Sequence, residues 1–134
     1  MRTYVFDSSA LWMFLQRKPG AAKLAGLLTD AMRHRAEILM SAVNFGEVYG
    51  LILREEGPDK ARTTAADVRP LPIQYEEATL QRCLNAAEAK VKYRLYYADS
   101  FAAALAIEKK ATLVTSDSDF RRLGHDFHIL WLKN

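Results

Sequence analysis

The alternation of short apolar runs with amphipathic stretches is the feature that most constrains the fold. Strand-like runs, rich in β-branched and aromatic residues, cover residues 2–6, 37–43, 69–74, 111–117 and 127–133. Stretches with helical spacing of apolar residues cover residues 8–18, 19–35, 44–57, 58–68, 76–94, 97–110 and 118–124. Strands that alternate with helices predict an α/β fold, a three-layer α/β/α sandwich around a mostly parallel sheet.

Two of these segments carry signals about their place in the fold. Residues 69–74 contain two prolines, which would interrupt a central ladder, so we expect an edge strand there. Residues 97–110 are apolar almost all round, which predicts a helix that is packed on more than one side. The acidic residue Asp99 in the first turn of that helix therefore needs an explanation.

Length and composition favour a single intracellular domain. The 134 residues suffice for one hydrophobic core, so we expect one domain over residues 1–134. Cys83 is the only cysteine, which excludes an internal disulfide and favours a cytoplasmic protein. No segment approaches the roughly 20 apolar residues that span a bilayer, so we expect no membrane association. The net charge of +3 suits a polyanionic partner.

Several acidic residues lie at equivalent places in the predicted fold. Asp7 comes directly after the first predicted strand, Asp117 lies at the end of the fourth, and Asp119 follows two residues later. Glu47 lies near the start of the helix that follows the second strand, and Asp99 lies at the start of the helix before the fourth. Because the carboxyl ends of parallel strands meet at one edge of a sheet, we expect these acids to converge there.

Two interpretations of these acids compete. Asp7, Asp99 and Asp117 sit near helix starts, where a carboxylate caps free N–H groups and meets the positive end of the helix dipole. Glu47 lies past the cap position, and a solvated helix face would account for it. Alternatively, the carboxylates meet, repel one another and are reconciled by a divalent cation.

The residue types decide which cation and which chemistry the second interpretation implies. Carboxylate oxygens without a His or Cys pair at ligand spacing favour Mg²⁺ or Mn²⁺ over zinc. Such sites leave coordination positions open for water and phosphate, which implies hydrolysis of a phosphate ester by metal-activated water. Ser8 has no partner base in the sequence, so we interpret it as a cap or as a hydrogen-bond donor to Asp7.

Four segments, in order, resemble the motifs of PIN-domain ribonucleases. They read "YVFDSSALWMFL", "SAVNFGEVYG", "YYADSFAAALA" and "LVTSDSDFRRL", and they are most similar to the motifs of VapC toxins of bacterial toxin–antitoxin pairs. The resemblance covers essentially the whole chain. It implies a parallel sheet with an acidic pocket at its carboxyl edge, and Mg²⁺- or Mn²⁺-dependent cleavage of single-stranded or loop RNA to 5′-phosphate and 3′-hydroxyl ends.

The resemblance also assigns roles to individual residues. The four acids that match the family's catalytic positions are Asp7, Glu47, Asp99 and Asp117. The residues expected to hold metal are Asp7, Asp99, Asp117 and Asp119, with Glu47 binding metal or orienting the attacking water. The supporting polar residues are Ser8, Asn44, Thr115 and Ser116. The basic residues that we expect near the RNA backbone are Arg17, Lys18, Lys92, Arg94, Arg121 and Arg122.

The resemblance further implies a cognate antitoxin, whose helix would lie in an apolar groove on the first helices, and a homodimer. Two alternatives stay open at this point. One is a different Mg²⁺-binding α/β protein, such as a phosphatase-like or receiver domain, although such folds need a second acid close to the first-strand aspartate. The other is a non-catalytic module that binds RNA or an antitoxin.

Overall fold

The computed structural model describes residues 1–133 and contains a five-stranded sheet in which every strand pair is parallel. The strands are β1 (Arg2–Phe6), β2 (Ala36–Ser41), β3 (Gln74–Glu76), β4 (Thr112–Thr115) and β5 (Ile129–Trp131). Their spatial order is β3-β2-β1-β4-β5, so the expected edge strand, β3, does lie at an edge. The predicted α/β class with a parallel sheet is confirmed.

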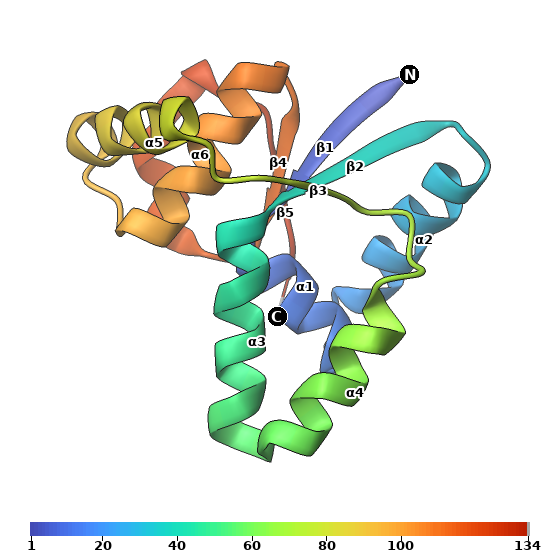
Figure 1. Cartoon of the computed structure of the whole chain (residues 1–134). Helices are drawn as coiled ribbons and strands as arrows, with labels where there is room; N and C mark the ends of the chain where they lie inside the picture. The colour runs from blue at the N-terminus through green and yellow to red at the C-terminus, as the bar shows by residue number, and fades with distance from the viewer. Residues whose placement is uncertain (134) are drawn as a thin grey trace.

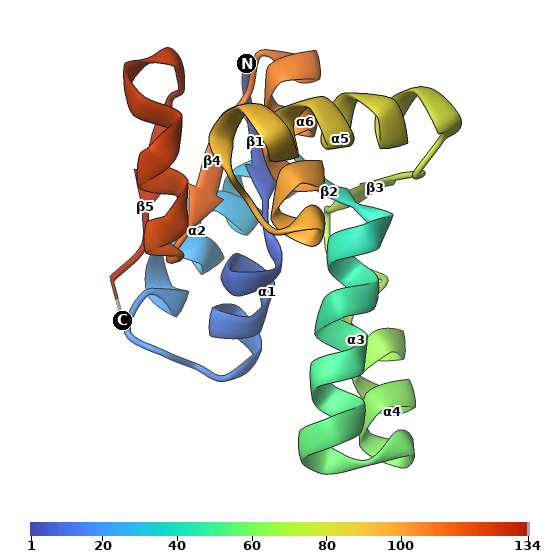
Figure 2. The same cartoon turned by 90° about the vertical axis from the view of Figure 1, so that its left-hand side faces the viewer.

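Helices cover both faces of the sheet (Figure 1). They are α1 (Ser8–Leu15), α2 (Ala21–Met32), α3 (Ala42–Glu56), α4 (Pro58–Val68), α5 (Leu80–Tyr93), α6 (Tyr97–Lys109) and the 3₁₀ segment η1 (Ser118–Asp126). Helices α1 and α2 lie on one side and α5 and α6 on the other, while α3 and α4 form a helical hairpin that extends from the body (Figures 1 and 2). The element order is the one that the sequence predicts.

The side chains of β1 alternate between two separate cores. Val5 packs with Leu39 and Leu113 in the core beneath α6, whereas Phe6 packs with Met40 in the core beneath α1 and α2. All five of these side chains are fully or almost fully buried. This alternation follows from the two-residue period of a strand, and burial on both faces explains why the strand sequences are nearly continuous apolar runs.

The structure corrects several predicted boundaries. Helix α3 begins at Ala42, inside the predicted strand 37–43, because the Ser41 hydroxyl accepts a hydrogen bond from Val43 N at 3.2 Å and caps the helix. The edge strand comes after the two prolines, at Gln74–Glu76, rather than across 69–74. Helix α5 therefore starts at Leu80 with Thr79 as its cap, and Glu76 and Glu77, which open the predicted helix 76–94, lie outside it.

The strand order has a topological switch point between β1 and β4, where the order along the sheet changes direction. Strand β1 pairs with β2 on one side and β4 on the other, and Phe6 is in register with Val114. Ligands of open parallel sheets bind outside the carboxyl ends of strands at such a switch point. This order differs from the 2-1-3-4-5 order of receiver domains, which excludes a receiver domain.

Candidate metal centre

Three aspartates bring carboxylate oxygens together at the carboxyl edge of the sheet. Asp117 follows β4, Asp119 lies in the first turn of η1, and Asp99 lies in the first turn of α6. One oxygen from each of the three lies within 4.8 Å of the other two. Asp99 comes before β4 in the sequence and the other two acids come after it, so the tertiary fold brings the cluster together.

Asp7 lies next to this cluster but has its carboxylate engaged by the protein. The residue is 2% exposed. Its Oδ1 accepts hydrogen bonds from Ser9 Oγ at 2.7 Å and from Ala10 N at 2.9 Å, and its Oδ2 accepts one from the Thr115 hydroxyl. The expected four-acid metal set is therefore divided into three mutually close carboxylates and one that neighbours them.

The hydroxyls of Thr115 and Ser9 connect the two strand ends. Thr115 Oγ1 also accepts a hydrogen bond from Asp117 N at 2.9 Å, and Ser9 Oγ accepts one from Ser116 N at 3.0 Å. The serine that donates to Asp7 is Ser9, whereas we expected Ser8 to be a cap or a donor to Asp7. Within residues 1–133, no hydrogen bond joins Ser8 to Asp7. Asp7 precedes the first helical residue, so Ser9 lies two positions after the cap and turns back toward β4.

Helix capping explains two of the acids and leaves the third unexplained. Asp7 caps α1, and Asp117 caps η1 by accepting a hydrogen bond from Asp119 N at 2.9 Å. The N-cap of α6 is instead Tyr96, whose side chain makes no capping bond. Asp99, only 8% exposed, is thus a buried acid that no cap requires.

Burial and mutual repulsion raise the pKa of two of these acids. Burial, and beyond it the negative charges of Asp117, Glu47, Asp7 and Asp119, raise the pKa of Asp99 from 3.8 to about 7. Burial also raises the pKa of Asp7 to about 6, although the hydrogen bonds from Thr115, Ser9 and Ala10 oppose that rise. The site is thus an arrangement of negative charges that the protein does not neutralise by itself.

Cationic side chains do little to compensate this charge. Among residues 1–133, no lysine or arginine forms an ion pair with Asp7, Asp99 or Asp117. One arginine approaches the site, with Arg122 Nη2 at 3.8 Å from Asp119 Oδ1. A divalent cation between the carboxylates would supply the missing positive charge.

Asn44 links the start of α6 to Glu47. The Asn44 side chain is fully buried, and its Nδ2 donates to the Ala98 carbonyl at 2.9 Å and to Glu47 Oε1 at 3.5 Å. Its Oδ1 is buried and has no hydrogen-bond partner. Glu47 itself is exposed and lies outside the three-carboxylate cluster, although its charge contributes to the raised pKa of Asp99.

The raised pKa of Asp99 predicts how stability depends on pH in a metal chelator. Between pH 3.8 and about 7 the folded protein keeps a proton that the unfolded chain has released, so stability is lost as the pH rises through this window. We expect Asp99→Asn to melt at a higher temperature than the wild type. The difference between the two melting temperatures should increase as the pH rises through this window, reach a few degrees, and stay constant above it. Paired thermal melts in EDTA at a series of pH values measure this difference. A difference that is independent of pH would contradict the assigned burial of Asp99.

The predicted basic residues do not all approach the acids. Arg17 borders a pocket between α1, α3 and α4, Lys18 follows it, and Lys92 lies over the Tyr93 ring at 5.2 Å from its centroid. Arg121 is exposed on η1. Two predicted residues do line a pocket together with Asp119, and these are Arg94 and Arg122.

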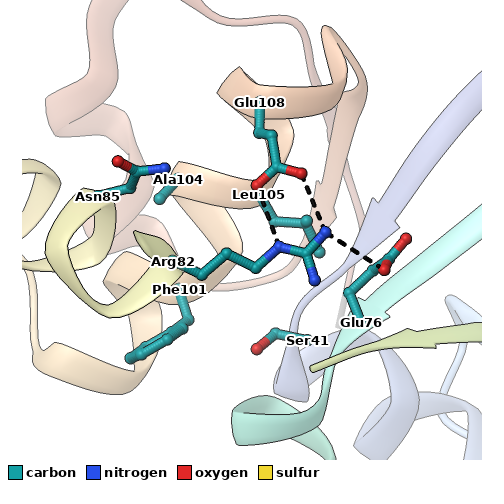
Figure 3. Close-up of a pocket in the computed structure, with 8 residues that line it drawn as sticks. All are labelled: Ser41, Glu76, Arg82, Asn85, Phe101, Ala104, Leu105 and Glu108. Carbon is teal, nitrogen blue, oxygen red and sulfur yellow. Dashed lines mark hydrogen bonds and ion pairs between the residues drawn. The ribbon is translucent and has the colours of Figure 1, made fainter. Parts of the chain in front are cut away.

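A second charged cluster fixes the helices that carry the site. Arg82 of α5 makes a bidentate contact with Glu108 of α6, at 3.1 and 3.0 Å, and lies 3.3 Å from Glu76 of β3 (Figure 3). The hydrogen bond from Arg82 lowers the pKa of Glu108. The adjoining cavity, about 10 Å³, is no larger than one water. This cluster therefore joins α5, α6 and the edge strand, and it offers no room for a ligand.

In residues 1–133, no helix has both the length and the apolar character needed to cross a membrane.

A search of curated proteins finds no relative with significant sequence similarity. Solved structures do match. VapBC2 from Rickettsia felis, bound to a DNA fragment from its promoter, matches with a TM-score of 0.74 and 13% identity, over 98% of this chain and 99% of the other.

Two further structures match over nearly the same length. VapC20 from Mycobacterium tuberculosis, a toxin that cleaves the sarcin–ricin loop, has a TM-score of 0.67 and 19% identity, over 90% of this chain and 95% of its own. DNA-bound VapBC from Salmonella typhimurium has a TM-score of 0.72 and 10% identity, over 97% and 98%. At such identities these matches establish a shared fold.

The family assignment comes from the sequence itself. The family model described as PIN domain matches residues 4–126, which is most of the chain and includes every acid discussed above. The chain therefore belongs to the PIN-domain family, with structural matches to VapC toxins of VapBC toxin–antitoxin systems.

Proposed function

We propose that this protein is a Mg²⁺- or Mn²⁺-dependent endoribonuclease, acting as the toxin of a toxin–antitoxin pair, with residues 1–134 as one nuclease domain. The observation that carries the proposal is the cluster of Asp99, Asp117 and Asp119 with Asp7 beside it. Among residues 1–133, Arg122, at 3.8 Å from Asp119, is the one basic side chain that forms an ion pair with these acids. PIN domains are typically nucleases, and one structural neighbour is named as a toxin that cleaves an RNA loop.

The donor atoms suit a hard divalent cation. The three close carboxylates offer oxygen ligands only, and no histidine or cysteine belongs to the set. We assign Asp99, Asp117 and Asp119 as the residues that would hold the ion, with Asp7 as a fourth ligand after a small shift of its carboxylate. Burial raises the pKa of the Asp7 carboxyl to about 6, and the hydrogen bonds from Thr115 and Ser9 oppose that rise, which favours the ionised form that a metal requires.

The reaction that we infer is hydrolysis of a phosphodiester bond. A divalent ion supplies polarisation of the scissile phosphate and a lower pKa for the attacking water. Glu47, exposed at the rim and contacted by Asn44, orients that water and accepts its proton. The water oxygen bonds to phosphorus, the bond from phosphorus to the 3′ oxygen breaks, and the leaving 3′ oxygen takes a proton from solvent. The products carry a 5′-phosphate and a 3′-hydroxyl.

We infer the cellular setting from the same relatives. The structural neighbours include toxin–antitoxin complexes, which supports a cognate antitoxin as the protein partner. Our proposal also includes a homodimer and a cytoplasmic location. Partly buried apolar side chains on α1 and α3, including Trp12, Leu15 and Tyr49, are candidates for the antitoxin contact.

RNA cleavage by the purified protein tests the proposal directly. We expect Mg²⁺ or Mn²⁺ to support cleavage of total RNA at a small set of sites, and EDTA to stop it, because Arg122 alone among the basic residues of 1–133 pairs with the carboxylate cluster and leaves most of its charge uncompensated. Sequencing of fragment ends identifies the cleaved bond and the terminal groups. Binding of RNA without cleavage, under all divalent conditions, would favour the non-catalytic alternative.

A further inference from the structure

A pocket beside the acidic cluster has the features of a nucleotide subsite. Its volume is about 550 Å³, within the range of small-molecule sites, and it lies between the end of α5, the start of α6 and η1. The lining residues that matter are Lys90, Arg94, Tyr96, Asp119 and Arg122. Asp119 belongs to the three-carboxylate cluster as well, so the pocket borders the proposed metal centre through this residue.

Tyr96 is the tyrosine of this region that lacks an aromatic partner. Tyr93 packs edge-on against Phe127 at 5.7 Å, and Tyr97 packs edge-on against Phe101 at 5.1 Å. The Tyr96 side chain is 74% exposed and makes no hydrogen bond or aromatic contact within residues 1–133. Its backbone is fixed, because it is the N-cap of α6 and its carbonyl accepts from Ser100 N at 3.0 Å. A fixed backbone with a free ring is what base stacking requires.

Three basic residues, Lys90, Arg94 and Arg122, line the same pocket as the Tyr96 ring. Lys90 lies in the last turn of α5, and Arg94 follows as its C-cap in the left-handed conformation, with φ of 56°. Arg122 reaches across from η1, with Nη1 donating to the Arg94 carbonyl at 2.7 Å. Lys90 and Arg94 at the end of α5 would also stabilise the helix dipole, but that role does not account for the exposed tyrosine that lines the same pocket.

We propose that this pocket binds an unpaired nucleotide of the RNA next to the scissile phosphate, with its base stacked on Tyr96 and its phosphate held by Lys90 and Arg94. The position of this nucleotide next to the scissile phosphate rests on the proposed function, because the acidic cluster determines where the scissile phosphate lies. Stacking on one exposed ring requires a base outside a helix, so this subsite would be one physical cause of the single-stranded or loop RNA preference that the resemblance to PIN-domain ribonucleases implies.

Binding measurements in EDTA separate this subsite from cleavage. Fluorescence anisotropy follows a short labelled RNA strand, the same strand paired with its complement, and the same strand with abasic positions. We expect Tyr96→Ala to weaken single-strand binding about tenfold, the order of one lost base stack. Tyr96→Phe should bind like wild type, and Val91→Ala, which truncates a 79% exposed neighbour without a ring, should also be unaffected.

The contribution of Lys90 and Arg94 is measured by the salt dependence of RNA binding in the same assay. We expect Lys90→Gln and Arg94→Asn each to reduce the slope of log K against log salt concentration by about 0.7. Asparagine suits position 94 because it tolerates a positive φ. Lys23→Gln, an exposed lysine on α2, is the matched control and should leave the slope unchanged. For abasic RNA, Tyr96→Ala should bind like wild type, while the two charge variants still lose affinity.

The outcomes distinguish this inference from the proposed function. Equal single-strand affinity of Tyr96→Ala and wild type would overturn the subsite, as would an equal loss for duplex RNA, even if the wild type cleaves RNA. A wild type that never cleaves RNA but loses single-strand affinity with Tyr96→Ala would overturn the nuclease and keep the subsite. Circular dichroism and thermal melting of each variant ensure that the comparison is between folded proteins.

Discussion

Asp99→Asn is expected to lower the rate of RNA cleavage about 1000-fold or more while leaving the protein folded. Loss of a residue that merely supports a metal ligand costs about 10- to 100-fold, and Asp99 is itself placed as a ligand. The substitution keeps the shape of the side chain and removes the charge. Single-turnover cleavage of RNA in Mg²⁺ by the wild type and the variant gives the ratio.

The same substitution should stabilise the protein when metal is absent. Asp99 is a buried carboxylate whose pKa is raised to about 7, so its removal relieves repulsion at neutral pH. We therefore expect an inactive variant that melts at a higher temperature than the wild type in EDTA. Asp67→Asn, an exposed acid on α4, is the matched control and should change neither activity nor melting. Unchanged cleavage by Asp99→Asn would refute the site assignment.

Mn²⁺ or Mg²⁺ is expected to raise the melting temperature of the wild type by on the order of 10 °C when the ion is present at about 100 times its dissociation constant. An ion that binds the folded site and not the unfolded chain shifts the equilibrium by mass action. Here the gain includes relief of repulsion among Asp99, Asp117 and Asp119. Differential scanning fluorimetry across an ion titration, at constant ionic strength, measures the shift.

Variants of the cluster decide where the ion binds. Asp99→Asn and Asp119→Asn should each remove most of the shift, whereas Asp67→Asn should keep it. Thr115→Ser retains the hydroxyl that donates to Asp7 and should also keep it. If the ions left the melting temperature of the wild type unchanged, the acids would be structural caps and buried charges without a metal role.

Much of the fold is predictable because strand and helix periods are local properties. The nearly continuous apolar run in β1 reflects burial on both faces, and α4 begins at Pro58 and ends at Val68, where the sequence predicts it. The wrong boundaries arose where a local signal had two possible structures. Ser41 could end a strand or cap a helix and does both, and Glu76 pairs in β3 instead of opening α5.

Ser9, the residue beside Asp7 that the sequence did not identify, depends on a contact between distant segments. Ser9 and Thr115 are 106 residues apart, yet their hydroxyl oxygens lie 3.2 Å apart because β1 and β4 are neighbours. No spacing in the sequence distinguishes Ser9 from Ser8 as the donor to Asp7. Likewise, the sequence contains three tyrosines near Asp99, and only packing shows that Tyr93 and Tyr97 have ring partners while Tyr96 does not.

The sequence by itself determined the class of fold, the parallel direction of the strands and the edge at which the acids would gather, because hydrophobic period and chain order set these. The strand order was decided by tertiary structure, since it depends on which helices bury which face. That order made Asp99, Asp117 and Asp119 a close group and left Asp7 beside them, held by hydroxyls. It also gave Asp99 its raised pKa, because burial and repulsion exist only once distant residues meet.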